Sequence, residues 1–128
     1  RMGRRSRMAE IEDLYRRIRE KDPDFILRTT LISGFPGETE EQHKKLLAFM
    51  EEHPFDRVGV FAYSAEEGTA AADYPNQVEH TVAVRRAEEI MEQQAGISGR
   101  RLQKRLGRTY TALVDGFDPD SGLYYGRS

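Results

Sequence analysis

The sequence predicts an α/β fold in which helix, strand, helix and strand follow one another before a long helix and a β-hairpin. Two observations predict the first part: segments with apolar residues at helical spacing alternate with short β-branched apolar runs, and the links between them are short. This order is typical of a parallel βα sheet or of a segment of a βα barrel. A third observation, turn residues between two apolar runs near the C-terminus, predicts an antiparallel hairpin on a separate plan.

The first helix is predicted by apolar residues three and four positions apart, which are Met8, Ile11, Leu14, Tyr15 and Ile18. It should end at Asp22, because a residue that precedes proline avoids the helical conformation. The run from Phe25 to Ser33 is typical of a strand. Its apolar residues fall on both alternating sets near its ends, which predicts a strand covered on both faces.

The second helix is predicted to begin at Thr39, because Thr39 and Gln42 have the spacing of a capping box. Its apolar-leaning stripe consists of His43, Leu46, Leu47 and Met50. The run from Arg57 to Tyr63 predicts a second strand. We expect the two strands to be parallel neighbours joined by the helix over residues 39–53.

The chain changes character after the second predicted strand. A polar loop over residues 64–77 is long enough to indicate a functional segment. A long helix is expected over residues 80–106, with Gly107 as its C-cap.

The C-terminal part is predicted to be a hairpin. The runs "RTYTALVDG" (108–116) and "LYYGRS" (123–128) flank the turn residues "DPDSG". The change from βα units to a hairpin predicts two domains, residues 1–102 and residues 103–128.

The composition excludes several kinds of site. The 128 residues contain no cysteine, so this chain alone forms no disulfide, zinc–thiolate site or cysteine-held iron–sulfur cluster. A net charge of −2 predicts neither a nucleic-acid nor a membrane partner from overall charge. No apolar run approaches the roughly 20 residues of a membrane span and no signal peptide is visible, which predicts a cytoplasmic protein. The sequence does not begin with Met, and we expect it to be a piece of a longer protein.

The turn "TLISGFPGETEEQ" (30–42) has the form of a phosphate-binding turn between strand and helix. Its chemistry argues otherwise, because Glu38, Glu40 and Glu41 crowd the helix start and no P-loop lysine is present. Two interpretations stay open: the glycines only let the chain turn, or they let a flat, neutral group lie against the strand end. In βα barrels ligands bind at the carboxyl ends of strands, which is where Gly34 falls.

Two motifs in order carry a family resemblance. The segments "ISGFPGETEE" and "FDRVGVFAYSAEEGTAA" resemble the radical S-adenosylmethionine methylthiotransferases, and "GRTYTALVDG" is similar to the opening strands of their TRAM domain, a small β-barrel. The resemblance implies the last βα units of a TIM-like radical SAM barrel followed by the first TRAM strands. With Glu66 and Glu67, the second segment looks like the branch of the family that methylthiolates an aspartate of small-subunit ribosomal protein S-twelve. The transfer-RNA branch, which modifies adenosine, stays open as an alternative.

The resemblance also implies cofactors and a site. The complete enzyme would use S-adenosylmethionine and two 4Fe-4S clusters, none of them held by this chain, so the chain alone is expected to be inactive. Residues implied at the adenine pocket are Ile32 for apolar contact, Gly34 for clearance, and Phe61, Ala62, Tyr63 and Ser64 with backbone groups. The match is partial, since Thr30 stands where the superfamily prefers glycine and Ala65 replaces a common proline. Ile32, Phe61 and Tyr63 are equally expected as core or rim residues.

A binding module is the rival hypothesis. The segment "GRRLQKRLGR" carries the cations Arg100, Arg101, Lys104, Arg105 and Arg108, to which the N-terminus adds Arg1, Arg4, Arg5 and Arg7. Clustered cations can follow an RNA backbone, but a solvated helix face explains them as well. Tyr110, Tyr124 and Tyr125 would stack on bases if RNA is the target.

The histidines and the strand edges support two further expectations. The three histidines, His43, His53 and His80, have no metal-ligand spacing, and the run His43-Lys44-Lys45 is expected to be solvated. The predicted strands at both ends of the chain would have unpaired edges, so the isolated chain is expected to self-associate.

Overall fold

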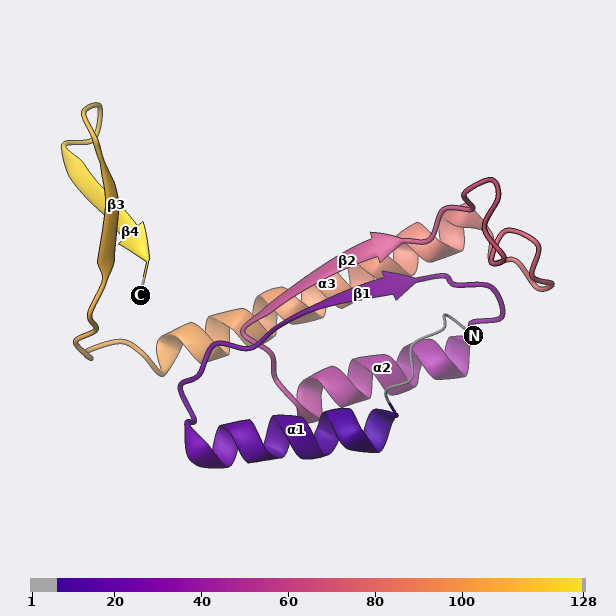
Figure 1. Cartoon of the computed structure of the whole chain (residues 1–128), viewed down its shortest axis with the longest axis horizontal. Helices are drawn as coiled ribbons and strands as arrows, with labels where there is room; N and C mark the ends of the chain where they lie inside the picture. Colours follow the sequence, from indigo (N-terminus) through magenta and orange to yellow (C-terminus); the bar gives the residue numbers. More distant parts are fainter. Residues whose placement is uncertain (1–6, 128) are drawn as a thin grey trace.

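The computed structural model describes residues 7–127, so predictions that involve Arg1, Arg4, Arg5 and Ser128 lie outside it. In chain order the elements are α1 (Met8–Lys21), β1 (Arg28–Ser33), α2 (Glu40–Glu52), β2 (Arg57–Ala62), α3 (His80–Gln103), β3 (Leu113–Asp118) and β4 (Leu123–Arg127). Figure 1 shows α3 running alongside β1 and β2, with the β3–β4 hairpin beyond the end of α3. The predicted mixed α/β architecture is confirmed, and the described residues form two two-stranded sheets.

Strands β1 and β2 are parallel neighbours joined by α2, as predicted. Their register places Arg28 beside Arg57 and Ile32 beside Phe61. The helix between them begins with the predicted capping box, in which Gln42 N donates to Thr39 Oγ1 at 3.2 Å and Thr39 N donates to Gln42 Oε1 at 3.1 Å. Both features follow from local sequence patterns.

The core lies on one side of the β1–β2 sheet. Buried Met50, Val58, Ile90 and Ile97 form it, and Leu31 and Val60 are among the half-buried side chains that pack against it. Because side chains alternate along a strand, Ile32 and Phe61 lie on the other side, where they are 41% and 65% exposed. The prediction that the first strand is covered on both faces is wrong for the described residues, because α2 and α3 contribute to the same core.

Strand β1 begins at Arg28, three residues later than the predicted start at Phe25. The backbone of Leu27 is engaged by the start of β2 instead: its N–H donates to Asp56 Oδ2 at 2.9 Å, and its carbonyl accepts the N–H groups of Asp56 and Arg57. The side chain of Asp56 therefore sets where the ladder between the two strands begins.

The C-terminal hairpin is antiparallel, as predicted, and Gly122 in its turn has the left-handed φ of 69°. Its first strand is Leu113–Asp118 and does not begin at Arg108 as predicted, and its first residue, Leu113, pairs with Arg127. Helix α3 ends three residues before the predicted Leu106, and a turn then leads to Gly107 with φ of 75°. None of the helices in residues 7–127 is long and apolar enough to cross a membrane.

Candidate functional site

The residues predicted for the site gather at the carboxyl ends of β1 and β2. Ile32 and Phe61 lie side by side on the uncovered face, and both are exposed. Ala62 lies on the face toward α3, since side chains alternate along the strand. Tyr63 continues the pairing, with its N–H donating to Ser33 O at 2.7 Å, and Ser64 is exposed at the start of the loop. The structure thus joins Ile32 and Phe61 into one apolar platform.

The structure gives its own reason for a glycine at position 34, separate from the adenine clearance that the resemblance implies. Its φ is 77°, and a Cβ built on it would lie 2.2 Å from the Cβ of Ala83 in α3. The space that a side chain at Gly34 would need is therefore filled by the helix. Glycine is required here because the turn is left-handed and the backbone passes directly against Ala83.

The turn after β1 is held by a buried arginine, Arg86, that was not among the residues predicted for the site. Gly34 N donates to Glu38 Oε2 at 3.0 Å, and Arg86 Nη1 donates to Glu38 Oε1 at 2.9 Å. Arg86 also donates to Glu40, and this hydrogen bond, followed by weaker contributions from Arg85, lowers the pKa of Glu40 against the opposing effect of desolvation. The amide of Gly34 is therefore bound to a carboxylate and is not free for an anion.

A sequence signal for Arg86 exists. Buried residues of α3 recur three or four positions apart, at Ala83, Arg86, Ile90, Gln94 and Ile97. An arginine within such a stripe must find partners on the elements that the helix covers, because a buried charge is costly when unpaired.

Three aromatic side chains pack together near this end of the sheet. The ring of Phe35 packs edge-on against Tyr63 at 5.4 Å and against Tyr74 at 6.2 Å. The loop that carries Tyr74 is tied to the turn by Gly37 N, which donates to Asn76 O at 2.8 Å. The buried hydroxyl groups of Ser33 and Tyr63 have no hydrogen-bond partner within residues 7–127. Unpartnered buried hydroxyls are rare, and these two belong to residues at the carboxyl ends of the two neighbouring strands.

His43 is buried, so the expectation that it is solvated is wrong. Its side chain is 1% exposed, and its Nε2 lies 2.7 Å from Glu89 Oε2 in α3. The hydrogen bond with His43, followed by that with Arg85, lowers the pKa of Glu89 although desolvation opposes this. The position of His43 in the apolar stripe of α2 therefore predicts its burial better than its two lysine neighbours predict its exposure. The described residues contain no group of three or more His, Cys, Asp or Glu side chains that could hold a metal ion.

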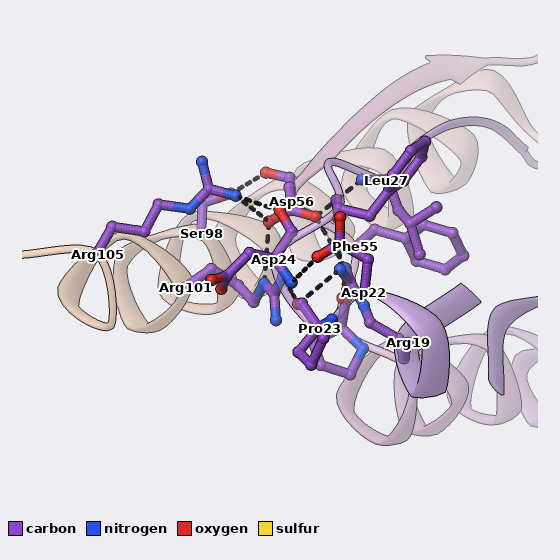
Figure 2. Close-up of polar contacts among 12 residues, drawn as sticks. Arg19, Asp22, Pro23, Asp24, Leu27, Phe55, Asp56, Ser98, Arg101 and Arg105 are labelled. Atoms are coloured by element: carbon purple, nitrogen blue, oxygen red, sulfur yellow. Dashed lines mark hydrogen bonds and ion pairs between the residues drawn. The ribbon is translucent and has the colours of Figure 1, made fainter. Parts of the chain in front are cut away.

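Several of the clustered cations form hydrogen bonds and ion pairs within the chain. Figure 2 shows Asp56 at the centre of a network between α1, the start of β2 and the end of α3. Asp56 Oδ2 accepts from Arg19 Nη2 at 2.8 Å, and Asp56 Oδ1 accepts from Arg101 Nε at 2.9 Å. Arg105 donates to Asp24 O at 3.0 Å.

The remaining cations of this segment differ in their partners. Arg100 pairs with Glu51 and Arg108 with Asp24, whereas Lys104 is exposed without a partner in the described chain. Tyr110 lies under Arg105, and Tyr124 and Tyr125 of β4 are exposed. The basic segment thus stabilises the fold with Arg101 and Arg105, and few of its charges are free.

The two parallel strands have helices on one side, and an apolar pair and a glycine turn lie at their carboxyl ends. These features define a βα unit of the kind that carries ligands at its strand ends. Comparison with known proteins agrees with the resemblance in the motifs. Over 116 residues the chain is 50% identical to "Ribosomal protein uS12 methylthiotransferase RimO" of Prochlorococcus marinus (strain MIT 9303), which covers 91% of this chain. These findings confirm the resemblance: the chain corresponds to a segment of the methylthiotransferase family and is similar to its RimO members.

Two further relatives carry the same name. The protein of Geobacter sulfurreducens is 46% identical over 123 residues, and that of Acetivibrio thermocellus is 45% identical over 127 residues, covering 96% and 99% of this chain. The chain spans only 25% to 28% of the length of these relatives. No family model matches the chain.

Proposed function

We propose that this chain is the part of a radical SAM methylthiotransferase that contains the last βα units of the barrel, in residues 1–102, and the first TRAM strands, in residues 103–128. The complete protein would transfer a methylthio group to the β-carbon of an aspartate in ribosomal protein uS12. The observation that carries the proposal is the exposed pair Ile32 and Phe61 at two adjacent strand ends, in a chain whose relatives are named uS12 methylthiotransferases.

The residues at the strand ends fit an adenine ring. Ile32 and Phe61 offer a flat apolar surface of the right kind, and the backbone from Ala62 to Ser64 offers polar groups at its rim. Gly34 contributes the shape of the turn, and Glu38 with Arg86 keeps that turn in place. S-adenosylmethionine would supply the reactive sulfonium, but the sequence has no cysteine to hold an iron–sulfur cluster. We expect the chain by itself to be inactive, with both 4Fe-4S clusters held by other parts of the protein.

The proposal is tested in the complete protein with Phe61→Ala. Phe61 is 65% exposed here, so its truncation should leave the fold intact while removing apolar contact with the adenine. We expect the affinity for S-adenosylmethionine to fall about thirtyfold, since a buried phenyl group contributes on the order of 2 kcal/mol. Equilibrium dialysis measures this loss, and the mass of a uS12 substrate reports methylthio transfer.

Phe25→Ala is the matched control, because Phe25 is 52% exposed and precedes β1 at the other end of the strands. It should leave cofactor affinity unchanged. Equal affinity of the folded Phe61→Ala protein and the wild type would remove Phe61 from the site.

Two alternatives are kept. The complete protein would instead methylthiolate an adenosine of transfer RNA, or the segment would dock to the ribosome or to RNA without catalysis of its own. Lys104 and the exposed rings of Tyr124 and Tyr125 favour RNA contact. Offering uS12 and transfer RNA to the complete protein in parallel distinguishes the two substrates, and a steep salt dependence of RNA binding supports docking.

We expect the isolated chain to self-associate. Both sheets have two strands, so every strand has an unpaired edge within the described chain. Apolar side chains on the hairpin are at least half exposed, namely Leu113, Val114, Phe117, Leu123, Tyr124 and Tyr125. Light scattering over a concentration series should show a rising mass, and Tyr124→Lys should reduce it more than Tyr110→Lys, which lies outside the strands. A constant monomer mass would contradict the expectation.

A further inference from the structure

A cavity lies at the end of the β1–β2 sheet that is remote from the candidate site. It has a volume of about 330 Å³ and is bounded by the start of β2, the last turn of α3, the segment after it and the end of β4. Its lining includes four arginines, Arg57, Arg101, Arg105 and Arg127, but a single carboxylate, that of Asp56. It is separated from the strand ends by the length of β1, about 16 Å at the usual rise per residue.

The carboxylate of Asp56 already pairs with two arginines. Asp56 lies 2.8 Å from Arg19, which is outside the cavity lining, and 2.9 Å from Arg101. Arg105 is 3.7 Å from the same carboxylate and donates mainly to a backbone carbonyl. Since a guanidinium has several N–H donors, Arg101 and Arg105 both retain donors that these contacts do not use.

Arg57 adds a charge with no counterpart. Neither Arg57 nor its register neighbour Arg28 has a side-chain partner among residues 7–127. Like charges side by side in adjacent strands destabilise a sheet, and an anion beside them would remove that repulsion. Arg127 is 75% exposed, and its one ion-pair partner within residues 7–127 is Asp115, at 3.3 Å.

We infer that this cavity binds a phosphate group, either free or in the phosphodiester backbone of RNA. The planar guanidinium of arginine binds two oxygen atoms of a phosphate at once. Four arginines around one cavity therefore suit a ligand with two negative charges better than a ligand with one carboxylate. The inference rests on residues that the proposed methylthiotransferase site does not use, so either can fail without the other.

The test uses the 128-residue chain and NMR of the arginine Nε–Hε groups. Inorganic phosphate replaces chloride at constant ionic strength, above the second pKa of phosphate. We expect saturable shifts of the Arg57 and Arg101 signals, and affinity about tenfold weaker in Arg57→Gln, as for loss of one charge-assisted hydrogen bond. The matched control is Arg17→Gln, since Arg17 is 70% exposed on α1 and its one ion-pair partner in the described part of the chain is Asp13, at 3.9 Å. It should bind phosphate as the wild type does.

A second titration with a labelled hexauridylate separates the two sources of phosphate. RNA binding that inorganic phosphate displaces and that Arg57→Gln weakens supports a backbone phosphate, whereas phosphate binding without RNA binding supports a free one. Shifts that do not saturate, equal losses in Arg57→Gln and Arg17→Gln, or equal affinity for acetate would overturn the inference. Circular dichroism checks the fold, and Arg127→Gln replaces Arg57→Gln if that variant does not fold.

Discussion

Replacing Gly34 with alanine is expected to lower the free energy of unfolding by about 3 kcal/mol. The residue has a φ of 77°, which costs an L-residue roughly 1–2 kcal/mol, and its new Cβ would lie 2.2 Å from the Cβ of Ala83. Forcing an extra carbon into a packed region adds about 1–3 kcal/mol. Urea denaturation followed by circular dichroism measures the loss.

Two variants separate the causes. Gly68 has a similar φ of 80° but nothing within 4 Å of the position of its Cβ, so Gly68→Ala should show the conformational cost alone. Adding Ala83→Gly to Gly34→Ala should recover part of the lost stability, because it removes the methyl group that is in the way. If Gly34→Ala is no less stable than Gly68→Ala, the close packing against α3 is not what requires this glycine.

The expected instability also bears on the proposed cofactor site. A variant with a larger residue at Gly34 would lose cofactor affinity through the displaced turn, whether or not an adenine lies nearby. Ile32 and Phe61, which are both exposed, are therefore the better positions for testing that site.

Asp56→Asn is expected to be the second strongly destabilised variant, by about 3 kcal/mol. Asp56 is 7% exposed and its partners Arg19 and Arg101 are 13% and 14% exposed, so loss of the charge leaves two nearly buried cations without their counter-ion. Asp13→Asn is the control, because Asp13 also meets two arginines but is 49% exposed, and its loss should cost under about 1 kcal/mol. Equal effects of the two substitutions would show that burial does not strengthen the Asp56 network.

The same network predicts a pH dependence. Burial opposes ionisation of Asp56, but hydrogen bonds from Arg19, the Leu27 amide and Arg101 outweigh it and lower the pKa of the carboxyl. The unfolded chain, with a pKa of about 3.9, then binds the proton at a higher pH than the folded chain does. The stabilisation is complete above that value and is lost as the pH falls through the lower folded pKa. The difference in stability between wild type and Asp56→Asn should therefore shrink below about pH 4, and a constant difference would contradict this.

Local patterns predicted much of the fold because the interactions behind them are local. The capping box of Thr39 and Gln42 involves residues within one turn of helix, and it forms as predicted. The parallel pairing of β1 and β2 follows from a short βα connection, and the hairpin from its turn residues. Local patterns did not predict the start of β1, because Leu27 is engaged by Asp56, which is 29 residues away in the chain.

The candidate site was predicted in part. The parallel pairing of the two strands was expected, and its register places Ile32 beside Phe61. Arg86 was not predicted as a support of the Gly34 turn, because its partner Glu38 is 48 residues away in the chain. His43 was expected in solvent because of its lysine neighbours, but a glutamate of α3 lies beside it.

The sequence by itself determined the type and order of the elements, the absence of cysteine ligands and the resemblance to methylthiotransferases. These depend on residue identity, on periodicity and on contacts within a few positions. Only the tertiary structure decided that Gly34 is needed against Ala83, that Asp56 joins the ends of three elements, and that one face of the sheet is left uncovered. The physical reason is that packing distances, burial and ion pairs between distant residues depend on how helices lie on strands, which no local pattern specifies.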